Sequence, residues 1–263
     1  MKRHLVTSGC SFSDNCNERW PHYLAKTLNA NLYNRGQGSC GNDWISKSAI
    51  YNTQVLLDQG ISSKRITVAV MWSGIDRKSV FISNNETPDF KNLINNGTPN
   101  PINFINELLN QTQLDSNLVD GYLVGSANCG FTNNKITTFK KEVIKKYTDE
   151  SLAIESYENF LRLQWFCKSN NIKLINQTYR DIMHYPKYAQ GPLTKDYYRN
   201  VTHLHNMIDF SNWIFWNKTG GLYEYTLDNQ LEFYPDKLHP LPSSHKHYVD
   251  NYLITEIQTR NFI

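Results

Sequence analysis

The sequence has no segment of the kind that crosses a membrane. A membrane-spanning helix takes roughly 20 consecutive apolar residues, and no apolar run in the 263-residue chain approaches that length. Residues 1–7 are basic but lack the apolar region of a secretory signal peptide. We therefore expect no membrane partner and, by default, a cytoplasmic location. A place in a virus particle stays open, because it would leave no such signal.

An excess of charge of one sign is also missing. The chain has 27 Lys and Arg residues against 24 Asp and Glu residues, which gives a net charge of +3 without a basic tract. Nucleic-acid binding needs a basic patch or stripe, so we expect no nucleic-acid partner. Hydrophobic residues make up 40% and charged residues 19%, which argues against a disordered chain. This length suits one domain over residues 1–263.

Paired cysteines are absent. The five cysteines, none in a C-x-x-C pair, are Cys10, Cys16, Cys40, Cys129 and Cys167. An odd number in a cytosolic chain is typical of free thiols. Cys10, Cys16 and Cys40 lie near the site predicted below, but their spacing matches no standard zinc finger. The sequence therefore predicts no metal.

Short apolar runs alternate with amphipathic segments in the first part of the chain. The pattern predicts strands at 2–7, 30–33 and 65–72, and helices at 20–28 and 43–59. This β-α-β-α-β alternation favours a parallel sheet with helices on both faces. The β-branched run 65–72 is expected to be the central strand.

The second half of the chain continues the alternation. It predicts a helix at 150–169, a strand at 172–176 and a last helix at 243–257. Two polar stretches interrupt the pattern, at about 83–148 and 179–230. We interpret them as insertions at the carboxyl edge of the sheet, where loops gather around ligands.

Each insertion holds one helical candidate and several aromatic residues. The helical candidates are 102–114 and 203–216. The aromatic residues include Tyr122, Phe131, Trp213 and Trp216. They would either stack on sugar rings or form a satellite core beneath the long loops.

Two segments at opposite ends of the chain carry the groups needed for nucleophilic catalysis. Ser11 follows the first strand on a Gly-Cys-Ser-Phe-Ser turn, and Asp236 precedes His239 by three residues. Serine attacks well only when an imidazole takes its proton, and the imidazole needs a partner that fixes its tautomer. We predict Ser11 as nucleophile, His239 as general base and Asp236 as orienting acid. A turn serine, a surface histidine and a capping aspartate are the structural alternatives.

Four segments, in this order, resemble the sequence blocks of the SGNH (GDSL-type) hydrolases. They are residues 9–13, 34–42, 68–76 and 236–240. The resemblance implies a flavodoxin-like three-layer α/β/α sandwich with a parallel sheet of about five strands. It also implies ester hydrolysis without a metal or organic cofactor.

Three positions depart from the pattern of that family. Cys10 replaces the Asp before the nucleophile, Ser39 stands at the second-block Gly, and Ile75 stands at the Asn that donates to the oxyanion. The resemblance therefore covers the nucleophile, the base and the orienting acid, but not the whole oxyanion hole.

Other groups could complete the oxyanion hole. Backbone N–H groups of Ser11 and of Gly38 or Ser39 could donate to the developing negative charge, whatever side chain they carry. We hypothesise that the Asn42 side chain supplies the donor missing at Ile75. The alternative is that Asn42 caps the helix predicted to begin beside it.

Three residues after the central strand are candidates for substrate binding: Trp72, Asp76 and Arg77. A guanidinium group suits a substrate carboxylate or phosphate. Alternatively, Arg77 pairs with a loop carboxylate such as Asp76 or Asp14.

Together these patterns predict a serine hydrolase that cleaves a small acyl ester through an acyl-enzyme. The expected substrate is a small-molecule or glycan ester. Two alternatives stay open: a non-catalytic module that binds a glycan or a protein, and an acyltransferase that excludes water from the same acyl-enzyme. The sequence does not indicate an oligomeric state.

Overall fold

A five-stranded parallel sheet with the order β2-β1-β3-β7-β8 forms the centre of the computed structural model. The structure describes residues 2–14, 18–38, 40–75, 77–83, 100–102, 121–125, 149–183 and 202–262. The strands of this sheet are β1 (Arg3–Gly9), β2 (Ala30–Asn34), β3 (Ile66–Trp72), β7 (Lys173–Thr178) and β8 (Trp213–Ile214). The predicted α/β class and sheet size are confirmed.

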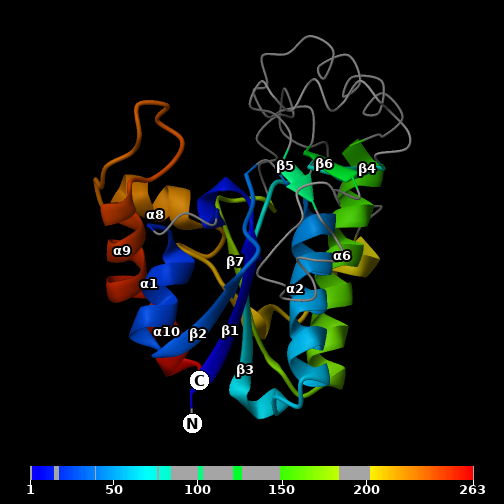
Figure 1. Cartoon of the computed structure of the whole chain (residues 1–263). Helices are drawn as coiled ribbons and strands as arrows, with labels where there is room; N and C mark the ends of the chain where they lie inside the picture. Colours follow the sequence, from blue (N-terminus) through cyan, green and yellow to red (C-terminus); the bar gives the residue numbers. More distant parts are fainter. Residues whose placement is uncertain are drawn as a thin grey trace.

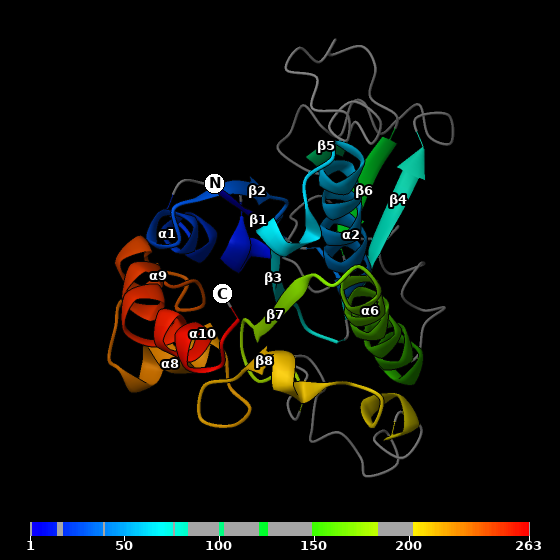
Figure 2. The same ribbon diagram turned by 90° about the horizontal axis from the view of Figure 1, so that it is seen from below.

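Helices cover both faces of this sheet. They are α1 (Trp20–Thr27), α2 (Asn42–Asp58), α6 (Asp149–Ser169), α8 (Leu222–Asp228), α9 (Pro242–Tyr248) and α10 (Ile254–Thr259). Figure 1 shows α2 and α6 on one side of the sheet and the other four helices on the opposite side. The view from below in Figure 2 shows the same three layers. No helix among the described residues is both long and apolar enough to cross a membrane.

Strand β3 is the central strand, as predicted. It pairs with β1 on one side and with β7 on the other, and Val68 lies opposite both Val6 and Leu174. All seven of its residues are buried. A parallel strand that is covered on both faces needs such a continuous apolar run.

A second, smaller sheet was not predicted. It is antiparallel, has the order β4-β6-β5, and consists of β4 (Ser79–Ser83), β6 (Gly121–Gly125) and β5 (Asn100–Ile102). In Figure 1 it lies near the upper ends of α2 and α6. A helix was predicted at 102–114, but its first residue, Ile102, is the last residue of β5. The rest of that prediction, 103–114, lies outside the described residues.

The helix predicted at 203–216 is also wrong. A short helical turn is followed by the 3-10 helix η3 (Phe210–Asn212) and then by β8. The carboxylate of Asp209 accepts from the Ser211 N–H at 3.0 Å and fixes the turn. Trp213 then pairs with Asn176 of β7, and its buried ring contacts the core. Tertiary packing thus overrides the local helical pattern.

The last predicted helix, 243–257, is interrupted. A π-helical turn, η4 (Val249–Leu253), separates α9 from α10. Tyr248 precedes this turn and Tyr252 lies within it. The hydroxyl groups of both residues donate hydrogen bonds to residues of the sheet or next to it. Tyr248 donates to Gln177 at 3.0 Å, and Tyr252 donates to the Phe215 carbonyl at 2.6 Å.

Candidate active site

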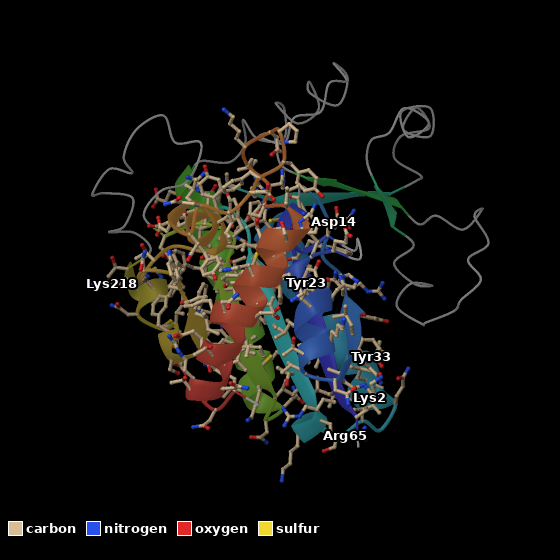
Figure 3. All side chains as sticks on the ribbon, turned by 90° about the vertical axis from the view of Figure 1, so that its left-hand side faces the viewer. Lys2, Asp14, Tyr23, Tyr33, Arg65 and Lys218 are labelled. Atoms are coloured by element: carbon tan, nitrogen blue, oxygen red, sulfur yellow. The ribbon has the colours of Figure 1, made fainter. Side chains whose placement is uncertain are left out.

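Ser11 lies at the carboxyl edge of the central sheet. It begins the 3-10 helix η1 (Ser11–Ser13), directly after β1. In Figure 3, Asp14 marks this edge, whereas Lys2 and Arg65 mark the opposite end of the sheet. Loops at the carboxyl edge are where open parallel sheets bind their ligands.

Two glycines allow the turn that carries Ser11. A Cβ atom on Gly9 would lie 2.1 Å from Ser13 Oγ, and one on Gly36 would lie 1.8 Å from the Ser13 carbonyl oxygen. Any larger residue would push Ser13 and the turn away. The glycines of the first and second sequence blocks therefore meet at a single residue beside the predicted nucleophile.

Hydrogen bonds then hold the turn in place. The Ser13 N–H donates to the Cys10 carbonyl at 2.8 Å, which closes the turn around Ser11. Trp20 donates through Nε1 to Ser13 Oγ at 2.8 Å, and Asn34 donates to the Ser13 carbonyl at 2.9 Å. Trp20 and Asn34 were not predicted as site residues, although Asn34 opens the second sequence block.

Asp236 and His239 lie on a short hairpin. Its two sides pair through bonds from the Tyr234 N–H to the His239 carbonyl at 2.8 Å and from the Leu241 N–H to the Glu232 carbonyl at 3.0 Å. At the tip, Oδ1 of Asp236 accepts from the N–H groups of Leu238 and His239, at 2.9 and 3.0 Å. The carboxylate thus fixes its own position relative to His239.

The His239 ring lies between Ser11 and Asp236. Its Nε2 is 2.8 Å from Ser11 Oγ, and its Nδ1 is 2.6 Å from Asp236 Oδ2. An ionised carboxylate only accepts, which assigns the proton to Nδ1 and leaves Nε2 to accept the Ser11 proton. The structure therefore brings together the three residues predicted as nucleophile, base and orienting acid.

The surroundings of Asp236 favour its charged form. Partial burial acts to raise the pKa of this carboxyl, but hydrogen bonds from the His239 N–H, the His239 ring and the Leu238 N–H lower the pKa to about 2. The carboxylate is therefore ionised at neutral pH. Phe12 packs against the imidazole with its ring centroid 5.3 Å away, which limits rotation of the His239 ring.

The loop of the second sequence block, within residues 34–42, lies beside the turn that carries Ser11. The Gln37 N–H donates to the Gly9 carbonyl at 2.9 Å, and Gly36 forms an isolated parallel bridge with Asp14. In the described part of the chain, neither the Ser11 N–H nor the Gly38 N–H donates to another group. Both are thus available as donors. Ser39, the other predicted backbone donor, lies outside the described residues.

The structure contradicts the oxyanion role predicted for the Asn42 side chain. Its amide nitrogen donates to the carbonyls of Ser73 and Gly74, both at 3.3 Å, and to Ser156 Oγ at 3.0 Å. Its amide oxygen accepts from the Ser73 N–H at 2.9 Å. An amide has two N–H donors, so none is left for a substrate.

The capping alternative for Asn42 is wrong as well. Gly41 is the N-cap of α2, and Asn42 is the first helical residue. The side chain of Asn42 instead ties α2 to the loop after β3. Ile75, at the position of the expected donor, is 1% exposed and belongs to the core.

Two of the predicted substrate-binding residues face inward, which corrects that prediction. Trp72 is fully buried and donates to the Asn176 side chain at 2.9 Å. Arg77 is 7% exposed, donates to Ser73 Oγ at 3.1 Å and lies over the Tyr179 ring. Arg77 therefore packs within the protein, and its alternative pairing with a loop carboxylate stays a prediction. Asp76 lies outside the described residues.

The tryptophans of the second insertion are packed against protein. Trp213 is 2% exposed and contacts Trp72, and Trp216 packs on Tyr225 and donates to Asp228 at 2.7 Å. For these two residues the satellite-core interpretation is right and sugar stacking is wrong. The side chains of Tyr122 and Phe131 lie outside the described part of the chain.

The described cysteines, Cys10, Cys40 and Cys167, are buried free thiols. Burial raises the pKa of Cys40 well above its usual range and that of Cys167 to about 12. Among the described residues, no three His, Cys, Asp or Glu side chains form a group that could hold a metal ion. Cys16 and Cys129 lie outside the described residues.

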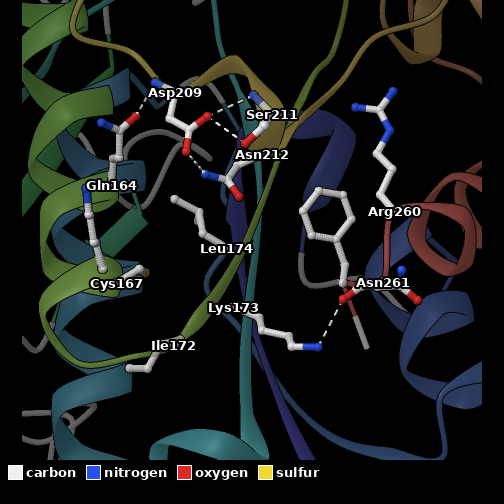
Figure 4. A pocket seen from close by; sticks show the side chains of 12 residues that line it. Gln164, Cys167, Ile172, Lys173, Leu174, Asp209, Ser211, Asn212, Arg260 and Asn261 are labelled. Carbon is white, nitrogen blue, oxygen red and sulfur yellow. Dashed lines mark hydrogen bonds between the residues drawn. The ribbon is translucent and has the colours of Figure 1, made fainter.

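A cavity of about 750 Å³ lies at the other end of the sheet from Ser11. It opens beside the first residues of β7, between α6, η3 and the end of α10 (Figure 4). Asp209 binds Ser211 and Asn212 at its rim, and Lys173 donates to the Asn261 carbonyl. The cavity is thus separate from the group formed by Ser11 and His239.

No protein-family model matches the chain, and no curated protein matches it. Among solved structures, the chain is similar to an acetyl xylan esterase from the rumen bacterium Butyrivibrio proteoclasticus, with a TM-score of 0.36 and 12% identity. The match covers 99% of this chain and 65% of the esterase chain, so this chain spans less than two thirds of that protein. The likeness is distant.

Proposed function

We propose that the protein is a serine hydrolase that cleaves small acyl esters through Ser11, His239 and Asp236. One observation carries the proposal: the His239 ring is within hydrogen-bond distance of Ser11 Oγ, at 2.8 Å, and of Asp236 Oδ2, at 2.6 Å. A serine hydroxyl group is activated when a base lies within hydrogen-bond distance of it and a carboxylate orients that base.

In the first half of the proposed reaction, Ser11 Oγ attacks the ester carbonyl carbon and its proton passes to Nε2 of His239. The Asp236 carboxylate stabilises the resulting imidazolium. The carbonyl oxygen becomes an oxyanion, which accepts hydrogen bonds from the backbone N–H groups of Ser11 and Gly38. The carbon–oxygen bond to the alcohol then breaks, the alcohol leaves with the proton from Nε2, and the acyl group stays on Ser11.

Water completes the cycle. Nε2 of His239 takes a proton from a water molecule, and the resulting hydroxide attacks the acyl carbon. The bond between that carbon and Ser11 Oγ then breaks, Ser11 Oγ takes the proton back from Nε2, and the carboxylic acid leaves. The side chains of His239 and Asp236 are 25% and 48% exposed. Solvent therefore reaches the base, which favours hydrolysis over acyl transfer, since transfer requires that water be excluded.

A small acyl group on a glycan is the substrate class that we propose. The support is the resemblance of the four sequence blocks to the SGNH hydrolases. Activated esters of increasing acyl length, followed by acetylated oligosaccharides, test the two parts of this statement separately. A preference for long acyl chains would contradict the first part, and inactivity on every acetylated sugar would contradict the second.

A fluorophosphonate probe with peptide mapping tests the function directly. We expect wild-type protein to become labelled on Ser11 and to hydrolyse a short activated ester. The variants Ser11→Ala and His239→Ala should lose both properties to a similar extent, because the residues act as one unit. Asp236→Asn should lower kcat by about 10⁴-fold, because it stabilises the wrong tautomer.

Ser243→Ala is the matched control, since Ser243 is an exposed serine of α9 outside the site. Its labelling and hydrolysis should equal those of wild type. Wild-type protein that neither labels nor hydrolyses would replace the proposal with a binding module. Labelling on Ser11 together with preferential transfer to an alcohol acceptor over water would make the protein an acyltransferase.

A further inference from the structure

Arg19 joins the two ends of the chain at the proposed active site. It is the N-cap residue of α1, on the same segment as Ser11. Its Nη1 donates to the Pro240 carbonyl at 3.2 Å, and its guanidinium lies over the Tyr234 ring, 5.5 Å from the ring centroid. Both partners belong to the hairpin that carries Asp236 and His239.

The two partners of Arg19 bracket His239. Pro240 follows it directly, and the Tyr234 N–H donates to its carbonyl at 2.8 Å. Pro240 also bridges to Phe233 on the other side of the hairpin. Arg19 therefore contacts both sides of the hairpin at the level of the imidazole.

The hairpin does not fix its own position relative to Ser11. Its internal bonds, from Leu238 and His239 to Asp236, set the carboxylate against the ring. They do so wherever the hairpin lies in the molecule. The distance from Nε2 to Ser11 depends instead on how the hairpin is held against the body of the protein.

Arg19 and the next residue connect these two parts. Trp20 donates to Ser13 Oγ at 2.8 Å and so holds the turn of the nucleophile, whereas Arg19 holds the hairpin of the base. His245 is fully buried against both residues, with Nε2 3.3 Å from Arg19 Nη1 and Nδ1 3.4 Å from the Trp20 nitrogen; its neutral ring accepts a hydrogen bond from one of these two donors at a time.

We propose that Arg19 is a positioning residue that sets His239 in hydrogen-bond distance of Ser11. The inference rests on the proposed hydrolase function. Arginine suits this role because its planar group can donate at its edge while its face stacks on an aromatic ring. Lysine offers a point charge without that geometry. Arg19 acts through the hairpin and does not touch the reacting atoms.

The test compares Arg19→Ala and Arg19→Lys with wild type. A displacement of about 1 Å at a reacting group can cost 10²-fold in rate, so we expect Arg19→Ala to lower kcat by about 10- to 100-fold with KM almost unchanged. The kcat of Arg19→Lys should lie between those of wild type and Arg19→Ala. Millimolar methylguanidinium should restore part of the Arg19→Ala rate, whereas an equal concentration of sodium chloride should not. Arg162→Ala, which removes an exposed arginine of α6 bound to Asn159, should behave as wild type.

Two readouts separate this inference from the proposed function. Crystal structures should show that the hydrogen bond between Ser11 and His239 is broken in Arg19→Ala and intact in wild type. The low-field NMR signal of the proton between His239 and Asp236 should persist in both proteins, because that pair is held within the hairpin.

An unchanged distance between Ser11 Oγ and His239 Nε2 in Arg19→Ala, or a change in KM alone, would overturn the inference even for an active enzyme. If wild-type protein has no esterase activity but Arg19→Ala still displaces the hairpin, the positioning role is upheld and the hydrolase is rejected. If Arg19→Ala does not fold, Arg19→Lys carries the same comparison.

Discussion

Ser13 is the residue on which the position of Ser11 most directly depends. Its side chain and carbonyl occupy the space that side chains at Gly9 and Gly36 would need. Its hydroxyl and carbonyl accept from Trp20 and Asn34. Two strand ends and one helix therefore meet at Ser13, so a change at any of them should reach Ser11.

The second-block glycines offer a matched pair of variants. In Gly36→Ala the new methyl group would lie 1.8 Å from the Ser13 carbonyl oxygen, so the backbone must move. We expect the free energy of unfolding to fall by about 1–3 kcal/mol, together with most of the ester hydrolysis. In Gly38→Ala the nearest atom is a carboxylate oxygen of Asp14 at 3.6 Å, an ordinary contact. Urea denaturation of both variants measures this difference in the free energy of unfolding. Equal stabilities of Gly36→Ala and Gly38→Ala would show that the turn around Ser13 can shift without a loss of stability.

At the residue scale, the sequence identifies best those residues that stand in a recognisable local pattern. Asp236 and His239 could be paired because three positions separate them, and Ser11 because it follows a strand on a tight turn. The roles given to Trp72 and Arg77 failed because position after a strand does not determine which way a side chain points. Arg19 could not be found, because no motif or local spacing links it to its partner Pro240, 221 positions away.

At the scale of elements, Asn42 is the joint between α2, the loop after β3 and α6. Its amide bonds to Ser73, Gly74 and Ser156 on these elements. Ser156 in turn donates to the Ile75 carbonyl at 2.9 Å. These polar groups are buried, so each depends on a protein partner.

Asn42→Ala should therefore act on stability. We expect the free energy of unfolding to fall by about 1–3 kcal/mol, because buried donors and acceptors of the loop are left without partners. The kcat per folded molecule should change little. Ser156→Ala should cost less, and the double variant should cost less than the sum, since the two residues share one network. Thermal or urea unfolding with active-site titration measures both quantities. A large fall in kcat at unchanged stability would restore the oxyanion role of Asn42.

Elements with a strong local period were predictable, and short elements set by packing were not. Strand β3 and helix α6 could be predicted because their apolar patterns extend over several residues. The two-residue strand β8 exists because Trp213 pairs with β7 and packs in the core. The three-stranded sheet joins segments that are separate in sequence, and its pairing leaves no local signal in a polar stretch.

At the scale of the whole molecule, His245 links α9, near the end of the sequence, to α1, the first α-helix of the chain, within one helical layer. It lies on α9, is fully buried, and accepts from the backbone N–H of Trp20 on α1 at 3.4 Å. Burial, with help from the nearby positive charge of Arg19 and from His239, holds the pKa of His245 well below its usual value of 6.5. The folded protein therefore keeps this ring neutral where the unfolded chain would protonate it.

This difference predicts how global stability depends on pH. Above pH 6.5 the ring is neutral in both states, and its contribution to stability is fully present. As the pH falls below 6.5, the unfolded state binds a proton that the folded state does not, so the free energy of unfolding should drop by up to about 1.4 kcal/mol per pH unit. The low pKa of Asp236, about 2, lowers stability only as the pH falls below its usual value of 3.8, and so has no effect between about pH 8 and about pH 5.

Urea unfolding of wild type and His245→Gln, between about pH 8 and about pH 5, tests this linkage. Glutamine keeps an acceptor for the Trp20 N–H and cannot titrate, so the variant should be less stable at about pH 8 but lose less stability on acidification. The free energy of unfolding of the variant should still fall slightly as the pH drops, because burial also lowers the pKa values of His4 and His22. If the free energy of unfolding falls equally steeply with pH in the two proteins, His245 must become protonated in the folded state while the contact between α1 and α9 stays closed.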